Sequence, residues 1–297
     1  MTRALCLALS LSLCGCLTFQ RAPLTDVPAG MTFVEVDGHR IRYVDEGEGP
    51  PVLLVHGFGS NLGVWSDVRD HLKAHHRVIA IDLLGFGHSD RPEADYSPAA
   101  QGRRVAAVMD RLGVESVALV AHSWGAAIAL ELARAQPDRI SRLALYNAWV
   151  YADQLPTLFH WSRTSGVGEA LTWLFYSDQG ERHLEQSFHD PERLTYEMVA
   201  ETEAAMAREG AEAVALAVVR GQRYEESEQH YQEVTQPTLI LWGRQDHVSL
   251  LSAGVRLSNQ LPQARLQVFE QCGHFTMLEA PSSTLLLAEF LAQGPGS

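Results

Sequence analysis

The stretch VALVAHSWGAA, residues 117–127, is the most informative part of the chain. An apolar run of strand length leads into the turn AHSWG, and small residues at helical spacing follow it. A strand–turn–helix of this kind places the hydroxyl of Ser123 on a sharp bend above the sheet, where it can act as a nucleophile. Small flanking residues are needed because the bend presses neighbouring backbone segments together. Gly125 meets this need, and Ala121 stands where glycine is usual.

Outward from this turn, apolar runs of strand length alternate with amphipathic segments. Strands are predicted at 32–36, 40–44, 52–55, 78–81, 116–120, 143–146, 238–242 and 266–269. Helices are predicted at 61–74, 97–112, 124–135, 250–260 and 282–293. This alternation predicts an α/β fold with a mostly parallel, eight-stranded sheet and helices on both faces.

One long segment breaks the alternation. Residues 149–233 contain no convincing strand. The first part of this segment is rich in aromatic side chains, and a helical, acidic stretch follows within it. We expect a helical cap at 149–236, inserted after strand six over the carboxyl edge of the sheet, where open α/β sheets bind ligands. The core is then formed by residues 31–148 and 237–297.

The first sixteen residues differ from everything that follows. Arg3 gives a positive start, an apolar run at 4–13 follows, and the run is too short to span a bilayer, which takes about 20 residues. The sequence Leu-Cys-Gly-Cys at 13–16 resembles the bacterial lipobox. By that resemblance residues 1–15 are a signal peptide, Cys16 carries a lipid, and residues 16–30 are a tether. The resemblance implies an exported lipoprotein anchored to a membrane of the bacterial cell envelope.

Composition excludes several other classes of protein. The chain has 297 residues, 46% hydrophobic and 20% charged, which is typical of a globular protein with a sizeable core. With 36 acidic against 23 basic residues its formal charge is −13, and no basic stretch could neutralise phosphates, so nucleic-acid binding is not expected. Of the four cysteines only Cys272 lies in the body, so neither a disulfide nor a cysteine metal site is predicted there.

Four further motifs accompany the serine turn. They are HGFG at 56–59, DLLGFGHSD at 82–90, WGRQD at 242–246 and CGHF at 272–275, each after a predicted strand. With the serine turn they resemble the α/β-hydrolase family from about residue 31 to the carboxyl terminus, interrupted by the cap. The resemblance implies a catalytic triad of Ser123, Asp246 and His274, in the chain order usual for that fold. It also implies that no cofactor is needed.

In such a triad His274 accepts the proton of the Ser123 hydroxyl, and Asp246 holds the imidazole in the correct tautomer. Backbone N–H groups of Phe58 and Trp124 are expected to form the oxyanion hole. Asp82 and Asp90 compete with Asp246 for the role of the acid, since they also follow a strand. The histidines at 56, 88 and 122 and the thiol at 272 are expected to be structural.

The family hosts several reactions, so the fold alone does not decide among them. Epoxide hydrolases and haloalkane dehalogenases of this fold use aspartate where this chain has Ser123. Carbon–carbon bond hydrolases share the serine triad but typically carry a glycine-proline step in the loop that here reads HGFGSN, and proline iminopeptidases usually show HGGPG there. Hydrolysis of a small apolar carboxylic ester is the leading prediction. The alternatives are those two hydrolases or a non-catalytic envelope lipoprotein on the same scaffold.

Overall fold

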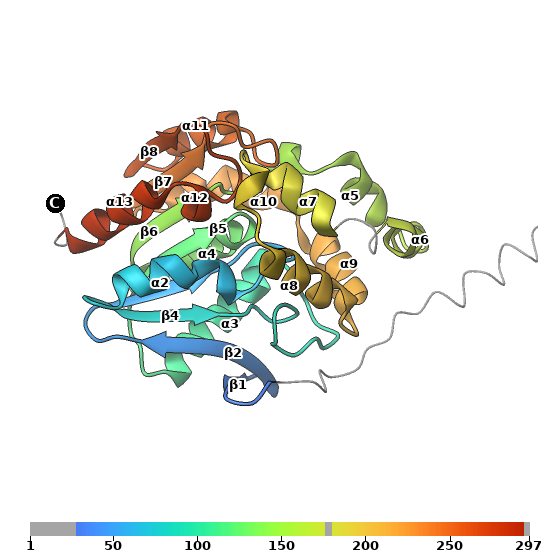
Figure 1. The fold of residues 1–297 in the computed structure, drawn as a ribbon, viewed down its shortest axis with the longest axis horizontal. Coiled ribbons are helices and arrows are strands. Elements are labelled where there is room, and N and C mark those ends of the chain that lie inside the picture. Colours follow the sequence, from blue (N-terminus) through green and yellow to red (C-terminus); the bar gives the residue numbers. More distant parts are fainter. Residues whose placement is uncertain (1–27, 176–179, 294–297) are drawn as a thin grey trace, which may run out of the picture.

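The fold is built on one sheet of eight strands in the order β1-β2-β4-β3-β5-β6-β7-β8 (Figure 1). The computed structural model describes residues 28–175 and 180–293. The strands are β1 Thr32–Val36, β2 His39–Glu46, β3 Pro51–Val55, β4 Arg77–Ile81, β5 Val117–His122, β6 Ile140–Tyr146, β7 Thr238–Gly243 and β8 Ala264–Phe269. Strand β2 runs antiparallel to β1 and β4, and the other neighbours are parallel. The predicted mostly parallel sheet is confirmed.

Alternate residues of the central strands pack on opposite faces of the sheet, as the period of two in a strand requires. One core cluster contains Val52, Leu54, Val78, Ala80, Val120 and Leu241. The other contains Leu53, Val55, Ile79, Ile81, Leu119 and Ile240. Because both faces are covered, these strands are continuous apolar runs in the sequence.

Helices cover both faces. Three helices pack on the face that carries Leu53: α3 Pro98–Arg111, α4 Trp124–Ala135 and α11 Leu251–Gln260. Two helices pack on the opposite face, which carries Val52: α2 Ser66–Leu72 and α13 Pro281–Ala292. Short elements complete the core: α12 Thr276–Glu279 and the 3₁₀ turns η1 Leu62–Trp65 and η2 Pro137–Arg139. The predicted helix at 61–74 is divided into η1 and α2 and ends at Leu72, and the Asn61 side chain caps η1 by accepting a hydrogen bond from Gly63 N at 2.7 Å.

The described part of the segment between β6 and β7 contains helices and 3₁₀ turns joined by short loops, and no strand. It contains α5 Thr157–Ser162, α6 Val167–Phe175, α7 Gly180–Ser187, α8 Tyr196–Ala207, α9 Ala211–Gly221 and α10 Tyr224–Ser227, with 3₁₀ turns η3 Ala152–Gln154, η4 Pro191–Arg193 and η5 Glu228–Glu233. It meets loops that follow strands: the Val214 side chain of α9 lies against Gly85, after β4, and the backbone carbonyl of Ser187 lies against Gly273, after β8. These helices, called the cap below, thus lie over the carboxyl edge of the sheet (Figure 1).

The predicted signal peptide, Cys16 and most of the predicted tether lie outside the described residues. Within the described ranges, none of the helices combines the length and the apolar character that crossing a bilayer requires.

Gly125 tests how tightly the first turn of α4 packs on β3. A Cβ at this position would lie 2.5 Å from the carbonyl oxygen of His56 and 2.9 Å from that of Val55. We expect Gly125→Ala to lower the free energy of unfolding by about 1–3 kcal/mol, because the backbone must shift. Urea denaturation measures the change. Gly102→Ala in α3 is the control, since its Cβ meets nothing closer than 3.4 Å; equal stability of the two variants would contradict this packing.

Candidate active site

Ser123 occupies the tight turn between β5 and α4. Its backbone has φ 53° and ψ −122°, a conformation that L residues rarely adopt and that costs about 1–3 kcal/mol. Hydrogen bonds from Ser123 N to Tyr146 O at 2.9 Å and from Trp149 N to Ser123 O at 3.1 Å hold it there. The turn leaves no room beside it, since a Cβ on Gly57 would lie 2.9 Å from the Ser123 Cβ. The strain therefore presents the hydroxyl above the sheet.

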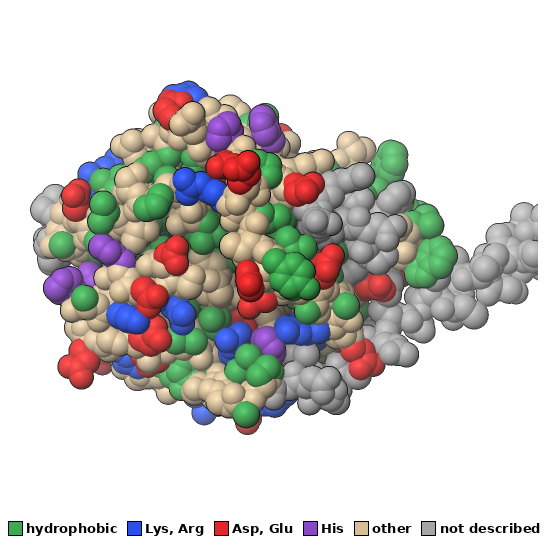
Figure 2. Space-filling model, in the orientation of Figure 1, with side chains coloured by type: hydrophobic (Ala, Val, Ile, Leu, Met, Phe, Trp, Pro, Cys, Tyr) green, Lys and Arg blue, Asp and Glu red, His purple; other side chains and the backbone are tan. Residues whose placement is uncertain are grey.

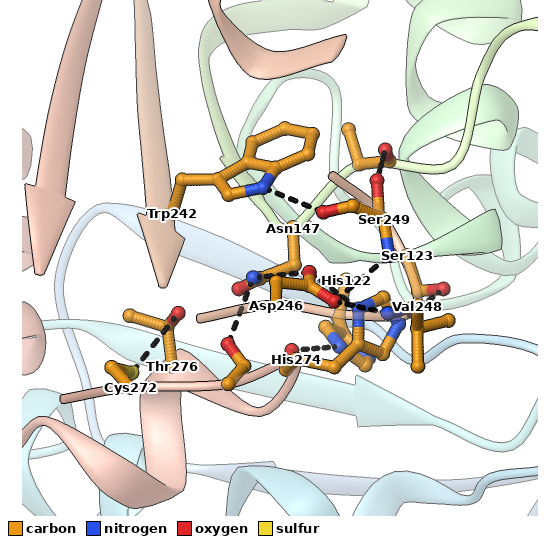
Figure 3. Close-up of polar contacts among 12 residues, drawn as sticks. His122, Ser123, Asn147, Trp242, Asp246, Val248, Ser249, Cys272, His274 and Thr276 are labelled. Carbon is orange, nitrogen blue, oxygen red and sulfur yellow. Dashed lines mark hydrogen bonds and ion pairs between the residues drawn. The ribbon is translucent and has the colours of Figure 1, made fainter. Parts of the chain in front are cut away.

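The structure brings Ser123, His274 and Asp246 together in one chain of hydrogen bonds (Figure 3). His274 Nε2 lies 2.9 Å from Ser123 Oγ, and His274 Nδ1 lies 2.8 Å from Asp246 Oδ2. All three are buried, with 8% of Ser123, 5% of His274 and 2% of Asp246 exposed. The arrangement can remove a proton from the serine hydroxyl and hold it on the imidazole.

Asp246 is fixed by further donors. Its Oδ1 accepts hydrogen bonds from Val248 N and Ser249 N, both at 2.8 Å, and its Oδ2 accepts one from Asn147 Nδ2 at 2.8 Å. With every other direction occupied, Oδ2 faces His274 Nδ1, so the Nδ1–H tautomer is favoured and Nε2 is left to accept a proton.

Sequence reasoning missed the role of Asn147. It directly follows β6 in the chain. In the structure Asn147 is fully buried with φ 46°, and its Nδ2 also donates to Gly273 O at 3.1 Å. It therefore ties the loop that carries Asp246 to the loop that carries His274. A polar residue directly after an apolar strand was the available signal.

The loop 56–59 lies beside the nucleophile. Phe58 is 37% exposed, and its ring packs edge-on against Phe86 at 5.8 Å. The ring of Trp124 lies 5.6 Å from the same Phe86. Because Trp124 is the first residue of α4, its N–H has no partner within the helix. Backbone N–H groups of both residues thus belong to segments that adjoin Ser123.

The other candidate groups have structural partners. Asp82 accepts hydrogen bonds from Leu62 N and His88 N, both at 2.8 Å, and Asp90 pairs with Arg40 at 3.0 Å, so no contact joins either acid to His274. Burial also raises the pKa of Cys272 to about 12, which leaves it a thiol rather than a nucleophilic thiolate.

Two further buried histidines lie beside the site, but neither takes part in the hydrogen bonds that join Ser123, His274 and Asp246. His56 Nε2 accepts from Leu83 N at 3.0 Å, and His122 Nε2 lies 2.9 Å from the carbonyl oxygen of His274. Burial lowers the pKa of both side chains, and for His122 the nearby His274 adds to the effect. Both are therefore neutral near pH 7 and support loops.

The cap is bound directly to the histidine loop. His274 N donates to Ser187 O at 2.7 Å, and the Phe188 ring stacks on Phe275 at 5.2 Å. Glu279 bridges the two segments: its carboxylate accepts from Gly273 N and from His189 N, each at 2.8 Å. The end of α7 thus helps to position His274.

Among the described residues no group of three or more His, Cys, Asp or Glu side chains could hold a metal ion, although His71 and His75 stand four apart in the chain.

A cavity of about 540 Å³ lies between residues 91–97 and α9, and Ser123 is not among its lining residues.

The chain belongs to the α/β-hydrolase fold family, whose profile matches residues 50–281, and the predicted resemblance is confirmed. It is similar to a 2-hydroxymuconate semialdehyde hydrolase from Pseudomonas putida, with 31% identity over 266 residues, or 86% of this chain and 92% of that protein. Among solved structures, an N-acyl homoserine lactone degrading enzyme matches with a TM-score of 0.75 and 26% identity, covering 87% of this chain and all (100%) of that one. A membrane phospholipase A, a bacterial virulence factor, matches with a TM-score of 0.74 and 26% identity over 97% of this chain and 91% of its own.

Glu279 provides a test of the bond between cap and histidine loop. In Glu279→Gln the amide offers one oxygen and one NH₂, so one of the two backbone donors loses its acceptor. We expect the free energy of unfolding to fall by about 1–3 kcal/mol, the cost of an unsatisfied buried donor. Urea denaturation followed by circular dichroism measures it, with Glu289→Gln on the exposed side of α13 as the control. A variant as stable as the control would show that the bridge contributes nothing.

Proposed function

We propose that this chain is a serine hydrolase that cleaves carboxylic esters through an acyl-enzyme on Ser123. The observation that carries the proposal is the continuous hydrogen-bonded chain from Ser123 through His274 to Asp246. An oriented base next to a serine on a strained turn is the arrangement that activates a hydroxyl.

The reaction has two halves. Ser123 Oγ attacks the ester carbonyl carbon while His274 Nε2 takes the hydroxyl proton, and the N–H groups of Phe58 and Trp124 stabilise the oxyanion. The oxyanion then collapses: the bond to the alcohol oxygen breaks, His274 returns the proton to that oxygen, and the acyl group stays on Ser123. A water molecule, deprotonated by His274, then attacks the acyl carbon. The bond to Ser123 Oγ breaks, His274 returns the proton to Oγ, and the acid is released.

Carbon–carbon bond hydrolysis is the second candidate, because the chain is 31% identical to a 2-hydroxymuconate semialdehyde hydrolase. Such enzymes would use the same triad. Ester cleavage is favoured because the loop at 56–61 reads HGFGSN, without the glycine-proline step typical of the carbon–carbon hydrolases. The similarity to an enzyme that degrades a lactone, a cyclic ester, and to a phospholipase A supports the same choice.

Ser123→Ala tests the mechanism. We expect hydrolysis of p-nitrophenyl esters to fall by at least roughly 10⁴-fold, because residues of a triad act as a unit. The assay uses short to long acyl chains on the full chain in detergent, and Ser141→Ala on the exposed side of β6 is the control. Activity that survives in Ser123→Ala would contradict the serine mechanism. Faster turnover of a 2-hydroxy-6-oxo-dienoate than of any ester would favour the carbon–carbon reaction, and a folded wild type inactive on both would favour the non-catalytic role.

We also propose that the enzyme is held at a membrane of the cell envelope by a lipid on Cys16. The support is the lipobox-like sequence at 13–16 and the similarity to a membrane phospholipase A. A bacterial lipoprotein carries more than one acyl chain, which gives stable attachment.

Cys16→Ala tests the anchor. We expect the wild type, expressed in a bacterium supplied with labelled palmitate, to incorporate the label and to sediment with membranes. The variant should lose the label, because the acceptor thiol is gone. Ser12→Ala in the leader is the matched control. Equal labelling of Cys16→Ala and the wild type would contradict the proposal.

A further inference from the structure

The outer end of the cap, where α5 and α6 pack together, exposes large apolar side chains. Trp161 on α5 and Val167, Trp173 and Leu174 on α6 are 42–62% exposed. These four residues are called the cap tip below. Figure 2 shows hydrophobic side chains at the edge of the molecule where Figure 1 places the two helices. Exposed apolar side chains gathered in this way mark a surface that binds a partner.

Helix α6 turns its apolar side outward, which is the reverse of an ordinary surface helix. Its one charged residue, Glu169, points inward and forms an ion pair with Arg220 of α9 at 3.0 Å. Val167 and Leu174 stand about two turns apart on the side of the helix away from α9, and Trp173 lies at the edge of that side. The apolar side of α6 is therefore left without a partner among the described residues of the cap.

Close packing fixes this orientation. A Cβ on Gly168 would lie 2.3 Å from the backbone oxygen of Ser162 on α5 and 2.9 Å from Leu216 Cδ1 on α9. Arg220 Nε also donates to the Ser162 oxygen at 3.0 Å, which ties α5 to α9 behind α6. Because α6 cannot rotate without breaking these contacts, its apolar side can be covered only from outside the cap.

The charges near the cap tip are paired, although the protein as a whole is acidic. Arg163 and Glu169 are the only Asp, Glu, Lys or Arg residues of the described segment 157–175. Arg163 pairs with Glu225 at 3.1 Å, and Glu169 pairs with Arg220. With a formal net charge of −13, most faces of the protein are repelled by anionic lipid head groups. The cap tip escapes this repulsion, and its two tryptophan side chains suit the boundary between head groups and acyl chains.

The amino-terminal chain brings a bilayer within reach. The described structure begins at residue 28, and the proposed lipid is on Cys16, twelve residues earlier. Twelve residues span at most about 40 Å, at roughly 3.3–3.6 Å each. The anchor therefore keeps the domain near enough to the bilayer for part of its surface to touch lipid. The cap tip has the apolar, charge-balanced character that such a contact needs.

We propose that the cap tip docks on the lipid bilayer that holds the Cys16 anchor. The inference rests on the proposed lipid anchor and adds to it a second, noncovalent contact, through Trp161, Val167, Trp173 and Leu174. Figure 1 places α6 and α13 at opposite ends of the molecule. Docking therefore orients the domain with its cap toward the lipid and α13 away from it.

Two labelled positions test the docking on the full chain, lipidated in a bacterium and reconstituted into vesicles of phosphatidylethanolamine and phosphatidylglycerol. Leu174→Cys on the cap tip and Leu285→Cys on α13 are matched, because both leucines are 54% exposed. Each cysteine carries a nitrobenzoxadiazole fluorophore, and the buried Cys272 does not compete for the label. Quenching by a nitroxide on the lipid acyl chains reports contact with lipid, and quenching by iodide reports contact with water. We expect severalfold stronger nitroxide quenching at the cap tip than at α13, and the reverse for iodide.

A charge on the other helix of the cap tip gives a second variant. Trp161→Asp, introduced together with Leu174→Cys, should lower nitroxide quenching to the level of the α13 position, because a carboxylate is costly to bury and is repelled by anionic lipid. Leu285→Asp in the same background is the matched control and should change nothing. Circular dichroism shows whether each variant is folded.

Three results would overturn the docking. Equal quenching at the two labelled positions, in protein that sediments with the vesicles, would do so and leave the anchor intact. A label at Leu174→Cys shielded from both quenchers would indicate a protein partner, such as a second copy, instead of lipid. Protein that does not sediment with the vesicles would overturn the anchor and the docking together. Hydrolysis of soluble p-nitrophenyl esters by the same samples tests the proposed catalytic function independently.

Discussion

The backbone of Ser123, held at φ 53° between β5 and α4, is the constraint on which the rest of the site depends. A residue in this conformation is stable only where its surroundings fix it from several sides. Here β5 ends at the residue before Ser123, α4 begins at the residue after it, and Tyr146 O accepts a hydrogen bond from Ser123 N. The same bend makes glycine necessary at 57 and 125, because a side chain at either position would collide with the turn or with β3.

Once the serine is fixed, its partners are positioned by loops that follow β6, β7 and β8. Asn147, Asp246 and His274 come from these three loops and bond to one another rather than to solvent. The cap adds a fourth support through Ser187, which accepts from His274 N, and through His189, which donates to Glu279 beside the histidine loop, so His274 is held from the core and from the cap alike. The alignment of His274 therefore depends on the cap as well as on the core.

Much of this could be predicted from the sequence, for physical reasons. The parallel strands are buried on both faces and read as apolar runs, and the turn around Ser123 carries small residues that few other structures require. The contacts that could not be predicted join segments far apart in the chain. Nothing local to Asn147 or Glu279 shows that they meet Asp246 and His189. The first pairing depends on how two strands lie side by side in the sheet, and the second on how the cap folds onto the core.

Covalent labelling tests most directly whether Ser123 is the activated nucleophile of this site. A fluorophosphonate probe forms a covalent bond to an activated serine with loss of fluoride, and peptide mapping by mass spectrometry locates the adduct. We expect a single adduct on the peptide that contains Ser123, formed rapidly by the wild type and suppressed in His274→Ala, where the base is absent. An adduct on another residue, or equal labelling of Ser123 without His274, would contradict it.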